Sequence, residues 1–298
     1  MSHEPVLLNE VLEYLGPKPG DFMIDGTMDG GGHATAIMEK ISPGGKLLGV
    51  DWDREMVARS RLGSRAGATL VRGNYADLPE ILAGKKFPLA DGLLLDLGFS
   101  SEQIAGSGRG FSFGEAAASE PLLMTYDDSR EPVREILRRI GEAELADIIY
   151  GFGGERFSRR IARAIKERGR RKPIETAGEL AETVREALPK SYERGRIDPA
   201  TRTFQALRIY ANGEIENLTK ILNELDRVLA PGGRAVIISF HSLEDGTVKR
   251  AFRTLVKAGK AELLTKKPVG AARGEILMNP RARTAKLRAI KYSPTSKL

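Results

Sequence analysis

The 298-residue sequence contains no cysteine, a single tryptophan and only 6% aromatic residues. The absence of cysteine excludes disulfides and thiolate metal sites, which fits a reducing compartment. No apolar run approaches the ~18 residues of a membrane-spanning helix, and residues 1–15 carry no basic leader. We therefore expect a cytoplasmic protein with no membrane partner. Its hydrophobic content of 41% and charged content of 29% are ordinary for a globular chain of one or two domains.

The most distinctive segment is glycine-rich and reads DGTMDGGGHATA at residues 25–36. It joins a short apolar segment to a segment with the apolar spacing of a helix. Gly30, Gly31 and Gly32 permit positive φ and leave backbone amides uncovered, and a helix start offers unpaired N–H donors to an anionic group. The segment predicts a loop that binds a nucleotide-type cofactor. The alternative is a plain tight turn between strand and helix.

A carboxylate at the end of the next apolar segment narrows the choice of cofactor. KLLGVD ends in Asp51, 19 residues after Gly32, close to the ~20 residues at which Rossmann-like folds place the acid that binds ribose. A dinucleotide fingerprint needs Gly or Ala three residues after Gly32, where Thr35 stands. S-adenosylmethionine fits better, with Asp25 near its amino end and Asp51 on its ribose. An NAD-dependent oxidoreductase is the alternative enzyme class.

The order of apolar and helical segments predicts two domains. Strand-like and helix-like segments alternate over residues 20–96, which is typical of a parallel sheet covered on both faces. The pattern gives way to helical periodicity alone over residues 101–198, then resumes with a helix that extends to Leu229 and a strand at residues 234–240. We predict an α/β, Rossmann-like domain with a mostly parallel sheet, formed by residues 1–105 and 199–298. An inserted all-helical domain at residues 106–198 is expected to recognise the substrate.

Polar residues follow two of the predicted strands. Asp96 ends the strand GLLLDLG, at the edge where open α/β sheets bind ligands. It could orient an exocyclic amino group toward a methyl donor, contact the cofactor, or only cap a turn. Ser239 and His241 alternate in SFHSLED and could line a base pocket. A Ser/His hydrolase lacks the expected GxSxG elbow, and the three histidines show no HxH or HExxH spacing, so we expect no metal.

The net charge of +7 is modest, but the basic residues are concentrated in two segments. Residues 156–172 contain nine basic residues and one acidic residue, with apolar residues at helical spacing on another face. Clustering of one sign costs self-repulsion unless a polyanion relieves it, so we favour a phosphate-contacting surface over a solvated helix face. The candidates for RNA contact are Arg159, Arg160 and Arg163, together with Arg281 and Arg283 of a second basic run.

Several long motifs occur in a fixed order after the glycine loop and Asp51. Together they resemble the MraW family of bacterial 16S ribosomal RNA cytosine-N4 methyltransferases, and the resemblance spans nearly the whole chain. The motifs are GNYADL at 73–78, LLLDLGFSSEQI at 93–104, RGFSF at 109–113, DPATRTFQALRI at 198–209, ISFHSLED at 238–245 and NPRARTAKLR at 279–288.

The resemblance implies a class I S-adenosylmethionine domain interrupted by a helical domain. It also implies methylation of a cytidine in the decoding region of 16S ribosomal RNA, with the small ribosomal subunit as partner, no DNA, and a homodimer left open. An RNA-binding assembly factor with an idle cofactor fold is the alternative outside enzymes. The cofactor contacts implied by the resemblance are Gly30, Gly31, Gly32, His33, Asp51, Tyr75, Asp96 and Gln103.

The sequence departs from the family pattern at a few positions. Asp29 stands where the family commonly has Gly, which adds a carboxylate beside the expected cofactor site. Leu123 and Thr125 replace an Asp and an Arg in the segment PLLMTYD. These three positions are the ones at which we expect this chain to differ from its family.

Overall fold

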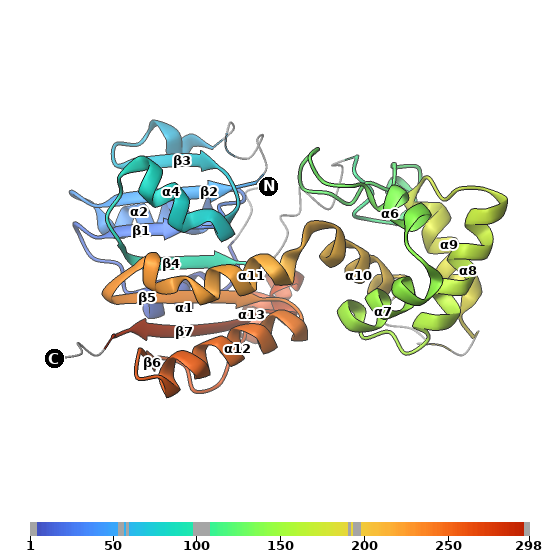
Figure 1. Ribbon diagram of the computed structural model, residues 1–298. Coiled ribbons are helices and arrows are strands. Elements are labelled where there is room, and N and C mark those ends of the chain that lie inside the picture. Colours follow the sequence, from blue (N-terminus) through green and yellow to red (C-terminus); the bar gives the residue numbers. More distant parts are fainter. Residues whose placement is uncertain are drawn as a thin grey trace. The chain divides into compact units, whose positions relative to one another are not determined.

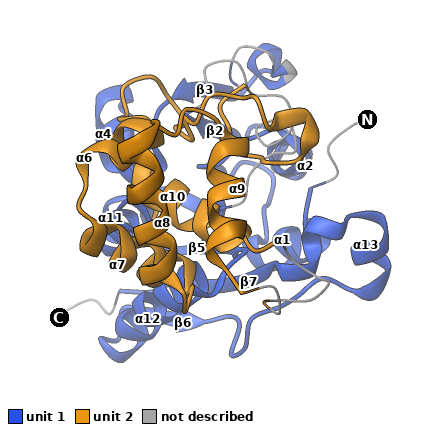
Figure 2. Cartoon of the chain, turned by 90° about the vertical axis from the view of Figure 1, so that its right-hand side faces the viewer, with its two compact units in different colours: residues 1–100, 215–298 blue, residues 101–214 orange. Residues whose placement is uncertain are grey.

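The computed structural model describes residues 5–52, 57, 60–97, 108–189, 192 and 198–294. The chain forms two compact units, residues 1–100 with 215–298 and residues 101–214 (Figure 2). Helix α10 (Thr201–Asn212) belongs to the second unit because it packs against α7 (Glu142–Gly153), so the second boundary lies later than residue 198. Over the described ranges, no helix has the length and apolar character needed to cross a membrane.

The first unit is built on a mostly parallel sheet (Figure 1). In its described part seven strands follow the order β3-β2-β1-β4-β5-β7-β6, and only β7 runs opposite to the other six. This confirms the predicted α/β, Rossmann-like fold. The order reverses between β1 and β4, and such a switch point is where open α/β sheets bind ligands. The strands are β1 (Phe22–Asp25), β2 (Lys46–Asp51), β3 (Ala68–Arg72), β4 (Ala90–Asp96), β5 (Leu229–Ser239), β6 (Ala261–Leu263) and β7 (Lys286–Tyr292).

Helices cover both faces of this sheet, which explains why its strands are apolar throughout. In β1, Met23 packs into the core on one face and Ile24 into the core on the other. One layer contains α1 (Leu8–Leu15), α2 (Gly32–Ile41) and the 3-10 turn η5 (Pro280–Thr284). The other layer contains α4 (Leu78–Lys85), α11 (Glu214–Asn223) and α12 (Ser242–Lys257) (Figure 1). Shorter elements are η1 (Arg61–Ser64), η2 (Tyr75–Asp77), η4 (Leu225–Arg227) and α13 (Arg273–Met278).

The helix expected to extend to Leu229 ends earlier, at Asn223. Leu229 is instead the first residue of β5 and pairs with Ala90, whose N–H donates to the carbonyl of Val228 at 2.8 Å. The register shifts after this pair, where Pro231 lacks an N–H for the ladder. Sheet pairing therefore overrides the helical spacing of the leucines. Among the helix-like segments expected between residues 20 and 96, the one from about residue 54 falls largely outside the described residues.

The second unit is helical in its described part, as predicted. One hydrophobic core joins its helices, and the isolated bridge between Pro121 and Thr176 is the only β pairing among the described residues of this unit. Thr176 is also the N-cap of α9 (Ala177–Ala187). Its hydroxyl accepts from the N–H of Glu179 while the Glu179 carboxylate accepts from the N–H of Thr176, which forms a capping box. Besides α7 and α10, the elements are η3 (Glu115–Ala117), α6 (Val133–Arg139), α8 (Ser158–Arg171) and α9 (Ala177–Ala187).

Candidate active site at the carboxyl edge of the sheet

Three neighbouring parallel strands each end in a buried aspartate. Asp51 ends β2, Asp25 ends β1 and Asp96 ends β4, so the three carboxylates meet at the switch point. Asp29 joins them from the glycine loop, and its N–H donates to Asp51 Oδ2 at 2.8 Å. We call Asp25, Asp29, Asp51 and Asp96 the carboxylate cluster. Sequence analysis placed these residues singly, and the strand order brings them together.

The cluster is electrostatically strained. The pKa of Asp25 is raised from 3.8 to about 7, mainly by burial and less by the charges of Asp96 and Asp51, against an opposing backbone hydrogen bond from Thr27. Burial and the same neighbours also raise the pKa of Asp29 well above its ordinary value. Asp25 Oδ2 is buried and has no hydrogen-bond partner within the described part of the chain. Such a site stabilises a cationic ligand and repels the pyrophosphate of a dinucleotide.

The glycine loop has a conformation that its residues require. Gly31 is the N-cap of α2 with φ of 76°, in the left-handed region that favours glycine. Asp29 also lies in this region, with φ of 44°, which explains why glycine suits the position. Aspartate is among the residues that tolerate it, and the hydrogen bond to Asp51 holds it there. No described side chain caps α2, so its first N–H groups remain available to an anionic group.

Close packing also restricts this loop. A side chain on Gly32 would come within 3.1 Å of the Pro5 ring, and one on Gly26 would lie 2.5 Å from Leu95. Gly30, by contrast, is exposed. The loop is therefore shaped by packing against the fold as well as by any ligand.

His33 links the loop to the end of β4. Its Nε2 lies 2.9 Å from the carbonyl oxygen of Val6, which can only accept, so we assign the ring proton to Nε2. The Nδ1 atom lies 3.8 Å from Asp96 Oδ2, and both residues are buried. The N–H of Asp96 donates to Thr27 Oγ1 at 2.6 Å. His33 and Asp96 are thus held beside each other at the switch point.

Tyr75 starts the turn η2 directly after β3 and is half-buried. Asn74 fixes this turn: its Oδ1 accepts from the N–H of Ala76 at 2.8 Å and its Nδ2 donates to Asn217 Oδ1 at 3.0 Å. Tyr75 lies beside the end of β1, since a Cβ on Gly26 would be 3.1 Å from the Tyr75 Cβ. An aromatic residue after a strand is a weak signal, and only the family resemblance singled it out. Gln103 lies outside the described residues.

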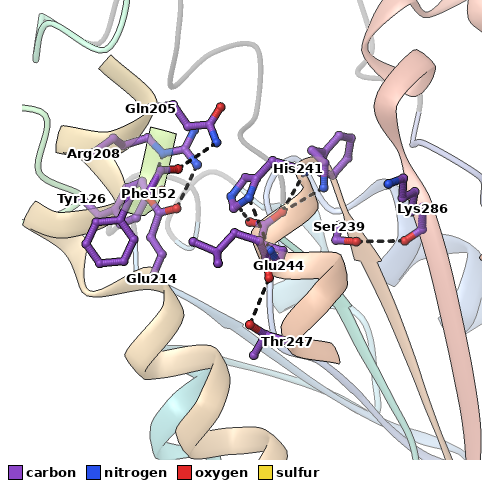
Figure 3. A network of polar contacts seen from close by, with 12 residues as sticks. Tyr126, Phe152, Gln205, Arg208, Glu214, Ser239, His241, Glu244, Thr247 and Lys286 are labelled. Atoms are coloured by element: carbon purple, nitrogen blue, oxygen red, sulfur yellow. Dashed lines mark hydrogen bonds and ion pairs between the residues drawn. The ribbon is translucent and has the colours of Figure 1, made fainter. Parts of the chain in front are cut away.

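Ser239 is the last residue of β5 and His241 lies two residues later, but they contact different partners (Figure 3). The Ser239 hydroxyl donates to the carbonyl oxygen of Lys286 on β7 at 3.2 Å. His241 is the N-cap of α12, where its Nδ1 accepts from the N–H of Glu244 at 3.4 Å and its Nε2 lies 3.1 Å from Glu244 Oε1. A nucleophilic serine would direct its hydroxyl proton at a histidine nitrogen. The described geometry therefore offers no support for a Ser/His hydrolase.

The basic residues expected to contact RNA occupy two elements. Arg159, Arg160 and Arg163 are exposed on α8, whose buried face includes Ile161 and Ile165. This matches an amphipathic helix that presents its charges to solvent. Arg163 Nε lies 3.5 Å from a carboxylate oxygen of Glu142, and at the exposed surface such a pair is weak.

The arginines of the second basic run lie in η5 of the first unit. Arg283 is exposed, whereas Arg281 is half-buried and its charge opposes the rise in the pKa of Asp29. Arg281 therefore lies near the carboxylate cluster, which sequence analysis did not anticipate. Further along the run, Arg288 is buried and its Nε donates to Asp245 Oδ1 at 2.7 Å, so it serves the fold.

The fold and the carboxylate cluster can now be compared with known proteins. A family model described as the MraW methylase family matches residues 1–293. The chain belongs to this family. Curated relatives named "Ribosomal RNA small subunit methyltransferase H" occur in Deinococcus radiodurans, with 44% identity covering 96% of this chain and 88% of the relative, and in Sorangium cellulosum, with 45% identity covering 97% and 90%. A third, from Syntrophus aciditrophicus, is 43% identical and covers 96% of both chains.

An MraW methylase uses S-adenosylmethionine, and the site fits this cofactor. S-adenosylmethionine carries a sulfonium and an ammonium group, whose positive charges suit a cluster of buried carboxylates. The uncapped start of α2 suits the carboxylate of the cofactor.

The structure also places the two residues of the second unit at which the sequence departs from the family pattern. Thr125 is buried and its carbonyl accepts from Arg109 Nη1, and the N–H of Leu123 donates to the carbonyl of Arg109. Both therefore pack around Arg109.

Proposed function

We propose that this chain methylates the exocyclic N4 amino group of a cytidine in the decoding region of 16S ribosomal RNA, the family's nucleotide 1402. The carboxylate cluster carries the proposal, because it combines a site for a cationic cofactor with the switch point of a methylase-family fold. When bound, S-adenosylmethionine supplies an electrophilic sulfonium methyl group. The names of the relatives support ribosomal RNA as the acceptor.

The proposed cofactor contacts follow the strand ends. Asp51 accepts from the ribose hydroxyls, and Asp25 faces the ammonium group. Tyr75 would contact the adenine, and Asp96 would contact the cofactor and the acceptor base. The glycine loop supports the methionine part through Gly30, Gly31, Gly32 and His33, and Gln103 completes the set.

The acceptor base needs orientation more than activation by a strong base. The amino nitrogen of cytosine is a poor nucleophile because its lone pair is delocalised into the ring, and it must be aligned with the methyl group. The Asp96 carboxylate accepts a hydrogen bond from this amino group, which directs its remaining electron density toward the methyl carbon. Ser239 and His241, at the end of the adjacent strand β5, help to position the base. As the N–C bond forms, the S–C bond would break with S-adenosylhomocysteine as the leaving group, and the amino proton would pass to Asp96 or solvent.

The helical unit is proposed to hold the surrounding RNA. A base inside a duplex cannot reach such a site, so the target cytidine must be unpaired or flipped out, and the flanking phosphates must be held elsewhere. The exposed arginines of α8 provide positive charge for those phosphates, and Arg283 adds to it from the first unit. The carboxylate cluster suits a cationic methyl donor, and the basic helical unit suits a polyanion. Both features agree with RNA as the substrate.

Two measurements separate this proposal from its alternatives. Calorimetry with S-adenosylmethionine and with NADH compares the cofactors, and we expect micromolar binding of the first and none of the second. Transfer of labelled methyl to naked 16S ribosomal RNA and to small subunits tests the reaction. Tight NADH binding without a response to S-adenosylmethionine would support an oxidoreductase. Binding of S-adenosylmethionine without methyl transfer to any form of the RNA would support the alternative of an RNA-binding assembly factor.

A further inference from the structure

The helical unit contains a pocket of about 210 Å³ between α6, α8 and the segment before α9. Its floor is apolar, formed by the buried side chains of Leu137, Ile165 and Ile174. Its wall is basic. The lining residues are Arg134, Leu137, Arg138, Ile165, Lys166, Gly169, Arg170, Pro173 and Ile174. The volume is below the ~300 Å³ at which pockets for drug-sized ligands begin, so the occupant is a small group.

The basic wall has more positive than negative charge. Of its four cations, Arg138 pairs with Glu135 and Glu175, and Arg134 Nε lies 3.5 Å from Glu135 Oε1, so four cations stand against two carboxylates. Lys166 is held in place, because its Nζ donates to the carbonyls of Leu137 at 2.8 Å and Ile140 at 2.7 Å. Burial lowers the pKa of Lys166, and the nearby charge of Arg170 lowers it further. The wall is therefore a site of uncompensated positive charge.

Arg170 is the cation best placed to bind a ligand. It is exposed at the rim and forms no ion pair with any residue in the described ranges. Its repulsion with Lys166 would be relieved by an anion between them. Arg170 also continues the stripe formed by Arg159, Arg163 and Lys166 at helical spacing along α8, so the pocket lies at the end of a basic track.

Gly169 keeps the opening of the pocket clear. It lies inside α8, where glycine is less favourable than alanine. A Cβ at this position would meet nothing within 4 Å, and φ is not in the left-handed region, so neither packing nor backbone geometry requires glycine. A larger side chain here would stand at the pocket entrance.

We propose that this pocket binds a backbone phosphate of the RNA substrate, with the adjoining ribose or base against its apolar floor. The guanidinium groups of Arg170 and Arg134 provide the fork of N–H donors that suits phosphate oxygens. That the polyanion is ribosomal RNA rests on the proposed function, whereas the phosphate-binding chemistry rests on the pocket. The pocket contributes to RNA affinity and not to the chemical step.

The variant Gly169→Leu tests the pocket without removing any charge. Its matched control is Gly151→Leu, in α7 of the same unit, where a Cβ also meets nothing within 4 Å. We expect Gly169→Leu to weaken binding of a labelled 16S ribosomal RNA fragment about tenfold, the loss expected for one charge-assisted contact. KM for methyl transfer should rise by a similar factor with kcat unchanged, and the control should stay within about twofold. Leucine favours helix, so unfolding midpoints should not fall.

A direct titration tests phosphate binding by the pocket independently of whether the protein methylates ribosomal RNA. Uridine monophosphate, uridine and a glutamate-rich peptide are titrated into the whole protein while the amide signal of Gly169 is followed by NMR. We expect the monophosphate to shift this signal and uridine to have a far smaller effect, with the shift lost in Arg170→Gln and kept in Arg171→Gln. A shift caused by the peptide alone, or no shift with any ligand, would overturn the proposed phosphate binding even if methyl transfer occurs. Equal RNA affinity of Gly169→Leu and wild type would also overturn it.

Discussion

At the scale of single residues, the carboxylate cluster shows how one residue type acquires different roles. Asp51 receives an N–H from the glycine loop, Asp96 lies beside His33, and Asp25 keeps a buried oxygen without a partner among the described residues. The environment of each carboxylate, set by its strand, decides whether it shapes the loop or holds charge for a ligand. The sequence predicts each strand-end aspartate. Their mutual repulsion depends on strand order, which no local pattern encodes.

The proposed ribose contact predicts a specific loss of affinity. Asp51→Ala removes a carboxylate that accepts from ribose hydroxyls, and a charged hydrogen bond is worth ~1.5–3 kcal/mol. We expect the Kd for S-adenosylmethionine to rise about 10- to 100-fold in calorimetry. Asp91→Ala is the matched control, because Asp91 also accepts a backbone N–H, that of Phe22 at 2.9 Å, at the opposite end of the strands. Equal affinity of Asp51→Ala and wild type would remove the ribose assignment.

The raised pKa of Asp25 predicts a dependence of stability on pH. Since this pKa rises from 3.8 to about 7 on folding, the folded protein keeps a proton that the unfolded chain releases above about pH 4. The free energy of unfolding therefore falls as the pH rises from about 4 to 7, by about 4 kcal/mol from this group. In Asp25→Asn that contribution is absent.

Urea unfolding of the cofactor-free protein at several pH values checks this prediction. The stability of Asp25→Asn relative to wild type should increase between about pH 4 and pH 7, because only the wild type must ionise a buried carboxyl. A constant difference over this range would mean that Asp25 titrates normally.

At the scale of elements, α8 and α11 show where sequence patterns succeed and fail. The basic stretch at residues 156–172 predicts an amphipathic helix, and α8 confirms it, because a helix that packs on one face needs only local periodicity. Leucines at the same spacing extend past the end of α11, yet the last of them enters β5. Pairing with β4 is a long-range interaction that helical spacing cannot reveal.

The exposed face of α8 predicts a salt-dependent effect on RNA binding. Arg160→Ala combined with Arg163→Ala should weaken binding of 16S ribosomal RNA and lower the salt slope by ~1–2, because each phosphate contact releases about one counterion. The control pair, Arg139→Ala with Arg185→Ala, removes the same charge from arginines already bound to Glu131 and Asp198. An equal change in both double variants would mean that α8 acts only through the overall charge and makes no specific phosphate contacts.

At the scale of the whole molecule, an α/β unit with the cofactor loop is interrupted by a helical unit with the basic helix. The alternation of segments predicts this insertion because strands and helices differ in period. The exact limit at residue 214 depends on the packing of α10 against α7, which the segment pattern does not contain. The sequence of the cofactor loop likewise does not identify the methyl acceptor. It is inferred from family membership and from the charge of the helical unit.

The most direct test of this account is to map the methyl group in the product RNA. Small subunits or 16S ribosomal RNA lacking the modification are incubated with the protein and S-adenosylmethionine, and the RNA is digested and analysed by mass spectrometry. The account predicts N4-methylcytidine at a single decoding-region position, and little or none with Asp96→Ala. A methyl group on another atom or another nucleotide, or no methylated RNA from any substrate form, would contradict it.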